Sequence, residues 1–206
     1  MKEEQTFRIG SCATAIKQFV IPALANFDGA RFALEVIADD EIERRLHDLT
    51  LDFGVVLRET LSRPLQSKVF AEAKLFLWVP KKLCKSERLA HQALKEHSLP
   101  LVLPGPELQL CQLTAPGGCA PHIQCTSFLE AQAALKQSAW ACLLPDFLTP
   151  EGNPGRFLRL SMPEMNVRFR LAWNPRMTRL NPVTIRRRDL LLLSLIRTRK
   201  SKSAAS

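Results

Sequence analysis

The sequence predicts an α/β fold, because short apolar strands alternate with helices whose apolar residues lie on one side. In the first third of the chain the order is strand, helix, strand, helix, strand. This order predicts a parallel sheet covered by helices on both faces. A second unit of two strands joined by a helix follows in the middle of the chain. With 206 residues, 46% of them hydrophobic, the chain can form one large domain or two small lobes.

The first element is a strand at Phe7–Gly10, followed by a turn of small and hydroxyl residues and then by a helix from Ala15 to Phe27. Apolar residues recur in that helix at spacings of three and four, which predicts one core-facing side. Pro22 predicts a kink or the start of a new helical segment. A strand, a tight turn and a helix start leave backbone N–H groups without partners, so this turn is a candidate anion site.

Two more strands follow, with a helix between them. Phe32–Ile37 is an apolar strand, and Asp39 is predicted to cap a helix that has acids in its first turn and extends through His47. The stretch Leu51–Leu57 is apolar throughout, which predicts a strand buried on both faces.

The middle of the chain predicts the second unit. A helix is expected from Ser86, with Leu89, Ala90, Ala93 and Leu94 facing inward. Ser127 and Glu130 have the spacing of a capping box for a helix through Gln137. The remaining expected segments are strands at Lys68–Phe70, Lys74–Pro80, Leu99–Leu103, His122–Thr126 and Trp140–Pro145, a charged hinge at Lys81–Lys85, and a loop rich in Pro and Gly at Pro104–Gly118.

The last segment is strongly basic. Apolar residues from Val167 to Trp173 alternate with Arg168 and Arg170, which predicts a half-buried strand with a cationic outer face. A closing helix is expected from Ile185 to about Arg197, and Lys200–Ser206 is expected to be a frayed tail.

The formal charge of +9 comes from this basic segment, which favours a solvated face or, less commonly, a surface for a polyanion. Arg186, Arg187 and Arg188 lie near the start of the closing helix, where cations oppose the helix dipole. They are therefore the candidate contacts for a polyanion.

Several classes of protein are disfavoured. Acidic residues near Met1 do not fit a secretion signal, and no apolar run reaches the ~20 residues of a membrane helix, so a cytoplasmic protein that does not bind membranes is expected. The cysteines have no metal-binding spacing and are expected to be reduced, with no metal bound. The histidines lie outside known catalytic motifs, and no nucleotide fingerprint is present. The expectation is a protein without catalytic residues or cofactor.

The order of the elements resembles the effector-binding domain of LysR-type transcriptional regulators, which has the type 2 periplasmic-binding-protein fold. The resemblance covers about residues 7–197. It implies two Rossmann-like α/β lobes, residues 1–80 with 160–206 and residues 81–159, with a ligand cleft between them. The residues that carry it are Phe7–Gly10, Ile21–Phe27, Leu51–Val56, Lys74–Pro80 and Leu143–Pro145.

The resemblance also implies where a ligand would bind, at helix starts and strand ends of both lobes. For Ser11 and Thr14, a plain helix cap is an equally good explanation. The implied ligand-binding residues are Ser11, Ala13, Thr14 and Arg58 in the first lobe and Val102, Leu103, Cys125 and Thr126 in the second.

The sequence departs from the family at three places. The family has a glycine before its Leu-Asp strand, where this chain has Leu49 and Thr50, and its glycine-rich turn before the Leu-Pro strand is here Ser138–Trp140. A Trp at this position is large enough to fill part of the cleft, and the sequence leaves open whether Trp140 does so. The family's winged helix-turn-helix would precede the first residue of this chain.

The first hypothesis for function is a sensor domain that binds a small metabolite, with an anion as the first candidate. It is expected to act as a homodimer, paired through first-lobe helices and second-lobe strands, or as a higher oligomer. DNA would be contacted only through a helix-turn-helix that this chain lacks. The alternatives are a solute-binding protein of the same fold, a polyanion- or DNA-binding module acting through the basic C-terminal region, and a degenerate remnant with a closed pocket.

Overall fold

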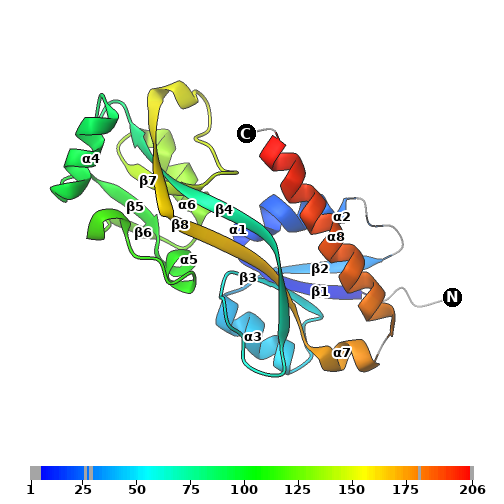
Figure 1. Ribbon diagram of the computed structural model, residues 1–206. Coiled ribbons are helices and arrows are strands. Elements are labelled where there is room, and N and C mark those ends of the chain that lie inside the picture. Colours follow the sequence, from blue (N-terminus) through cyan, green and yellow to red (C-terminus); the bar gives the residue numbers. More distant parts are fainter. Residues whose placement is uncertain (1–5, 26, 28–29, 181, 205–206) are drawn as a thin grey trace. The chain divides into compact units, whose positions relative to one another are not determined.

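The computed structural model describes residues 6–25, 27, 30–180 and 182–204 (Figure 1). The chain divides into two compact α/β units, which we call unit 1 (Met1–Glu72 with Arg168–Ser206) and unit 2 (Ala73–Val167). The predicted α/β class is confirmed. Two long strands, β4 (Gln66–Pro80) and β8 (Phe157–Trp173), each contribute residues to both units. The predicted lobe limits, 80–81 and 159–160, lie near the ends of these strands and stay a prediction.

Unit 1 contains the predicted parallel sheet. Strand β1 (Thr6–Ser11) pairs in parallel with β2 (Arg31–Val36) on one side and with β3 (Phe53–Val56) on the other. The end of β8 runs antiparallel to β3, with Val56 opposite Arg170. All four residues of β3 are buried, as its apolar sequence predicts.

The helical segment after β1 is not a single α-helix. It consists of α1 (Ala13–Ala15), a π-helix, η1 (Ile16–Val20), and α2 (Ile21–Leu24). Pro22 lies in the first turn of α2, where its missing N–H costs little. In a regular α-helix its ring would also press on the carbonyl four residues earlier, and the wider π turn relieves that clash. The break predicted from Pro22 is thus confirmed as a π-helix followed by a new α-helical turn.

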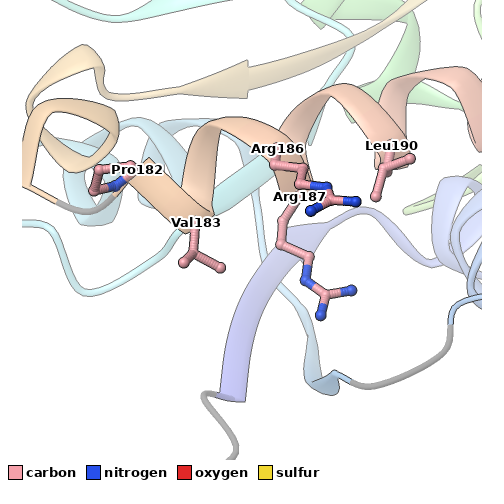
Figure 2. Close-up of a pocket in the computed structure, with 5 residues that line it drawn as sticks. All are labelled: Pro182, Val183, Arg186, Arg187 and Leu190. Carbon is pink, nitrogen blue, oxygen red and sulfur yellow. The ribbon is translucent and has the colours of Figure 1, made fainter.

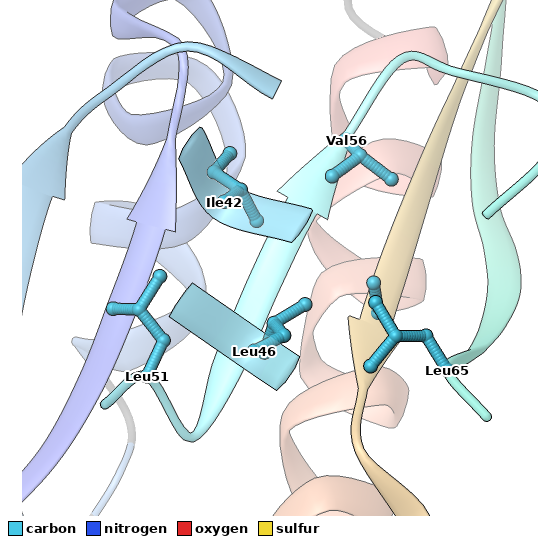
Figure 3. Packing of buried hydrophobic residues seen from close by; sticks show 6 residues of the cluster. Ile42, Leu46, Leu51, Val56 and Leu65 are labelled. Atoms are coloured by element: carbon cyan, nitrogen blue, oxygen red, sulfur yellow. The ribbon is translucent and has the colours of Figure 1, made fainter. Parts of the chain in front are cut away.

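Helix α3 (Asp39–His47) covers one face of this sheet. Its apolar residues Ile42 and Leu46 pack with Leu51, Val56 and Leu65 in one buried cluster (Figure 3). Asp39 is not the cap, because the N-cap residue is Ala38 and makes no side-chain capping bond. That detail of the sequence analysis was wrong.

The chain ends in α7 (Pro175–Leu180), which the sequence analysis did not predict, and α8 (Pro182–Ala204). Helix α8 begins close to the predicted position but continues beyond Arg197 through most of the expected tail, so the predicted end was wrong. Nothing from Arg197 to Ala204 is a Gly or Pro that would stop a helix. The side of α8 that carries Leu191 and Leu195 is buried, and the Ser194 hydroxyl donates to the carbonyl of Ala23 (2.7 Å).

In the eight-stranded sheet, the strands of unit 2 follow the order β4, β7, β5, β6. Strand β5 (Leu101–Pro104) lies between β6 (Ile123–Cys125) and β7 (Ala141–Pro145) and is parallel to both, whereas β4 is antiparallel to β7. The sequence analysis expected two segments where β4 is continuous. The buried alanines Ala71 and Ala73 let the strand run through that region without a break.

The helices of unit 2 follow the prediction in part. Helix α4 (Glu87–Lys95) is capped by Ser86 as expected, but Leu89 is 49% exposed rather than inward. Helix α5 (Gly105–Leu110) lies in the predicted loop, because a Pro in the first turn starts a helix as readily as it forms a loop. Helix α6 (Phe128–Ala134) continues as a 3-10 turn, η3 (Leu135–Gln137), to the predicted end. Two further 3-10 turns are η2 (Pro116–Gly118) and η4 (Pro154–Arg156).

Within the part of the chain that the structure describes, no helix is long and apolar enough to cross a bilayer.

Candidate functional site

The first group of candidate residues lies where β1 ends in unit 1. The Ser11 side chain is fully buried, and its hydroxyl donates to the carbonyl of Val55 on β3 (2.8 Å). Ser11 therefore joins two strands of the sheet. The N-cap residue of α1 is Cys12, which makes no side-chain capping bond, so the cap explanation for Ser11 was wrong.

The two other residues of this group differ in exposure. Thr14 is fully buried, whereas Ala13 is partly exposed at the start of α1. What this turn offers a ligand is its backbone, since Ala13 has no functional side chain and Ser11 already bonds to β3.

The end of β3 is held by an acid that the sequence analysis assigned to a different role. One oxygen of the buried Asp39 carboxylate accepts from the backbone N–H groups of Leu57 (2.9 Å) and Arg58 (3.1 Å). Burial raises the pKa of Asp39, although these two bonds oppose that effect. The Arg58 guanidinium donates to Glu43 (3.0 Å), so this candidate ligand contact is already paired with an acid.

In unit 2, Val102 and Leu103 belong to the central strand β5 and are buried. Their side chains pack in the core of the unit. A ligand at this end of β5 would therefore meet the backbone where the strand ends at Pro104.

Cys125 and Thr126 lie together at the end of β6. Burial, followed by the charge of Glu130, raises the pKa of the Cys125 thiol to about 11, so the thiol is uncharged at neutral pH. Thr126 is exposed, but its N–H (2.7 Å) and hydroxyl (2.9 Å) both donate to the Glu130 carboxylate. The predicted capping box is half confirmed. Ser127 Oγ accepts from Glu130 N (3.3 Å) as expected, but the Glu130 carboxylate binds Thr126 instead of returning to the N–H of Ser127.

A second acid reaches the same helix start. The buried Glu107 of α5 accepts from the N–H of Phe128 (2.6 Å). The backbone donors at the start of α6 thus face two carboxylates of the chain itself. An anionic ligand would be repelled there unless a cation balanced these charges.

Trp140 lies away from these residues within unit 2. It immediately precedes β7, whose first residue pairs with Leu101 at the beginning of β5. The candidate residues Leu103 and Cys125 lie toward the other ends of β5 and β6. Its ring packs near that of His122 (6.3 Å between centroids). Within this unit, Trp140 does not cover the carboxyl ends of the strands.

The three arginines proposed for polyanion binding divide into two groups. Arg186 and Arg187, with Pro182, Val183 and Leu190, line a hollow of about 570 Å³ beside α8 (Figure 2). Arg188 instead donates to Asp189 (2.7 Å) and lies over the Trp173 ring (4.8 Å).

None of the six cysteines forms a disulfide. Within the described residues, no group of three or more His, Cys, Asp or Glu side chains is arranged to hold a metal ion.

The amino-acid sequence assigns the chain to a protein family. The pattern of the LysR substrate binding domain matches residues 2–185, which is most of the chain. The chain belongs to this family. The chain is therefore an effector-binding domain of a family that regulates transcription, and it has the type 2 periplasmic-binding-protein fold.

Solved structures agree with the LysR assignment at the level of the fold. The reduced OxyR regulatory domain from Pseudomonas aeruginosa is 13% identical, with a TM-score of 0.66, and the match covers 93% of this chain and 96% of that one. CrgA from Neisseria meningitidis, a LysR-type transcriptional regulator, is 14% identical, with a TM-score of 0.67 and coverage of 95% and 69%. A mutant OxyR from Corynebacterium glutamicum has a TM-score of 0.72 at 14% identity, with coverage of 98% and 66%.

A search of curated proteins found no match.

Two acids at these strand ends were missed or misassigned by sequence reasoning. Asp39 was interpreted as a cap, and Glu107 lay in a predicted loop. Each accepts a backbone N–H from a residue far along the chain, and only the acid-rich helix start at Asp39 gave a local signal.

Proposed function

We propose that this chain is the ligand-sensing domain of a LysR-type regulator and binds a small metabolite. The match to the LysR substrate binding domain over residues 2–185 carries this proposal. Ligand binding changes the conformation or the pairing of such a domain, and that change is its output.

In this proposal the ligand contacts the turn after β1, with Ser11, Ala13 and Thr14, and the end of β3 at Arg58. It also contacts the ends of β5 and β6, with Val102, Leu103, Cys125 and Thr126. The carboxyl ends of parallel strands are the usual place for ligands in open α/β sheets. Support comes from the partly exposed turn at Ala13 and from Thr126, which is exposed.

The proposal includes a homodimer paired through first-lobe helices and second-lobe strands. Ile21 of α2 (53% exposed) and Ile123 of the edge strand β6 (41% exposed) support it, because each presents an apolar side chain on such an element. Sedimentation at several protein concentrations gives the oligomeric state. A monomer at every concentration would contradict this part of the proposal.

A thermal-shift screen of organic acids, amino acids and small aromatic compounds tests ligand binding. A compound at about a hundredfold excess over its dissociation constant is expected to stabilise the folded protein by ~2.7 kcal/mol. If no compound stabilises it, the sensor function is wrong.

A second candidate function, the binding of polyanions through α8, rests on the hollow beside Arg186 and Arg187. It predicts that binding to duplex DNA of any sequence falls steeply with salt. The double variant Arg186→Gln/Arg187→Gln should lose most of this binding. DNA binding that does not depend on salt, or that the double variant retains, excludes this candidate.

A further inference from the structure

Arg170 of unit 1 is partly buried, and among the described residues no acid pairs with it. Arg170 lies on β8 directly opposite Val56 of β3, so both side chains are on the same face of the sheet. That face carries the apolar cluster beneath α3, which includes Val56 and Leu65 (Figure 3). Arg170 is partly buried, and its Nε is shielded from solvent without a hydrogen-bond partner.

The acids nearby are bound to other arginines. Arg168, two residues earlier on the same face, donates to Glu72 (2.9 Å) and lies 3.5 Å from Glu59. Glu43 pairs with Arg58. Among the residues that the structure describes, no carboxylate is paired with Arg170.

This arrangement is unfavourable for a side chain that only fills space. Shielding part of a cation without a counter-ion costs free energy, and a methionine would cover the same apolar surface without that cost. The guanidinium has five N–H donors, arranged to bind both oxygens of one carboxylate.

Backbone donors at two of the candidate positions, the end of β3 and the start of α6, are already used. Asp39 accepts the N–H groups at the end of β3, while Glu107 and Glu130 accept those around the start of α6. At these two positions an anionic effector therefore needs its positive partner from a side chain.

We propose that Arg170 binds the carboxylate of the effector. This inference rests on the proposed sensor function and assigns its ligand to the carboxylates. Because Arg170 keeps part of its surface in solvent, a ligand can reach the guanidinium without unfolding of unit 1.

The test uses the full chain and three variants. Arg170→Met keeps the length of the apolar stem and removes the charge. Arg170→Lys keeps a positive charge but lacks the planar guanidinium that can bind both oxygens of a carboxylate. Arg168→Met is the matched control, since Arg168 lies on the same strand face but is exposed and already paired. Thermal shifts are measured at constant ionic strength with small mono- and dicarboxylates, their carboxamide analogues and inorganic phosphate.

The expected result is that carboxylates stabilise the wild type and the Arg168→Met variant, and that Arg170→Met binds them roughly 10- to 100-fold more weakly. The affinity of Arg170→Lys for carboxylates should lie between those of the wild type and Arg170→Met. Without ligand, Arg170→Met should melt at a higher temperature than the wild type, whereas a residue needed only for packing would leave both the melting temperature and the carboxylate response unchanged.

Carboxylates that bind Arg170→Met as tightly as the wild type would overturn the role of Arg170 and leave the sensor function intact. Stabilisation by carboxamides or phosphate but not by carboxylates would overturn the ligand class, again with the sensor function intact. No stabilisation of the wild type by any compound would overturn both.

Discussion

Three α-helices are followed by a residue that has a left-handed backbone conformation without being glycine. Leu49 (φ 59°), His97 (φ 54°) and Gln112 (φ 56°) follow α3, α4 and α5. In each case the next N–H returns to a carbonyl in the last helical turn, as in Ser98 N to Ala93 O (2.9 Å), which is a Schellman motif. The family has a glycine before its Leu-Asp strand. Leu49 at this place adopts the left-handed conformation that glycine favours.

These helix ends lead to a prediction at the residue scale. Replacing the exposed His97 with glycine should raise the free energy of unfolding by ~0.5–1 kcal/mol, because glycine removes the left-handed strain but adds entropy to the unfolded chain. His91→Gly is the matched control, since His91 is exposed inside α4 and the change should lower stability by about 0.3–0.5 kcal/mol. Urea denaturation of both variants measures the difference, and a loss of stability in His97→Gly would refute this account of the helix ends.

The limits of sequence reasoning are also clearest at this scale. Apolar patterns marked the strands that hold Ser11, Val102 and Cys125, so the positions of the candidate residues along the chain were predictable. What each side chain binds was not, because Ser11 bonds to Val55 and Asp39 bonds to Leu57 over long sequence separations. Such partners follow only from tertiary packing.

Among the elements, the short strands and the helices with a clear start were predicted to within a few residues. Helix α4 was found from Ser86 because its hydroxyl makes the expected cap. Helix α5 was missed because Gly105 and Pro106 are typical of loops and also of a first helical turn. The continuity of β4 was missed because the alanines in its middle carry no strand signal.

Helix α8 gives the prediction at the scale of elements. Leu191 (1% exposed) packs in the core of unit 1, while Leu193 (53% exposed) faces solvent two residues later. Leu191→Ala should lower the free energy of unfolding by ~2–4 kcal/mol and Leu193→Ala by less than ~0.5 kcal/mol. Equal losses in urea denaturation would show that the faces of α8 are assigned wrongly.

Across the whole molecule, both units follow the same plan, in which parallel strands end at short turns. In each unit the chain's own carboxylates accept backbone N–H groups at these turns, through Asp39 in unit 1 and through Glu107 and Glu130 in unit 2. The excess positive charge of the sequence comes from its C-terminal quarter, which includes Arg170 and the arginines of α8. A carboxylate ligand close to these acids would therefore need a side-chain cation as its positive partner.

The most direct test of the sensor account is amide NMR of the whole chain, titrated with a carboxylate that stabilises it in the thermal-shift screen. The account predicts saturable shifts at Ala13 and Thr14 in unit 1 and, at the same ligand concentration, at Leu103 and Thr126 in unit 2, because the proposed ligand-binding residues belong to both units. Shifts confined to α8, or to one unit alone, would contradict it.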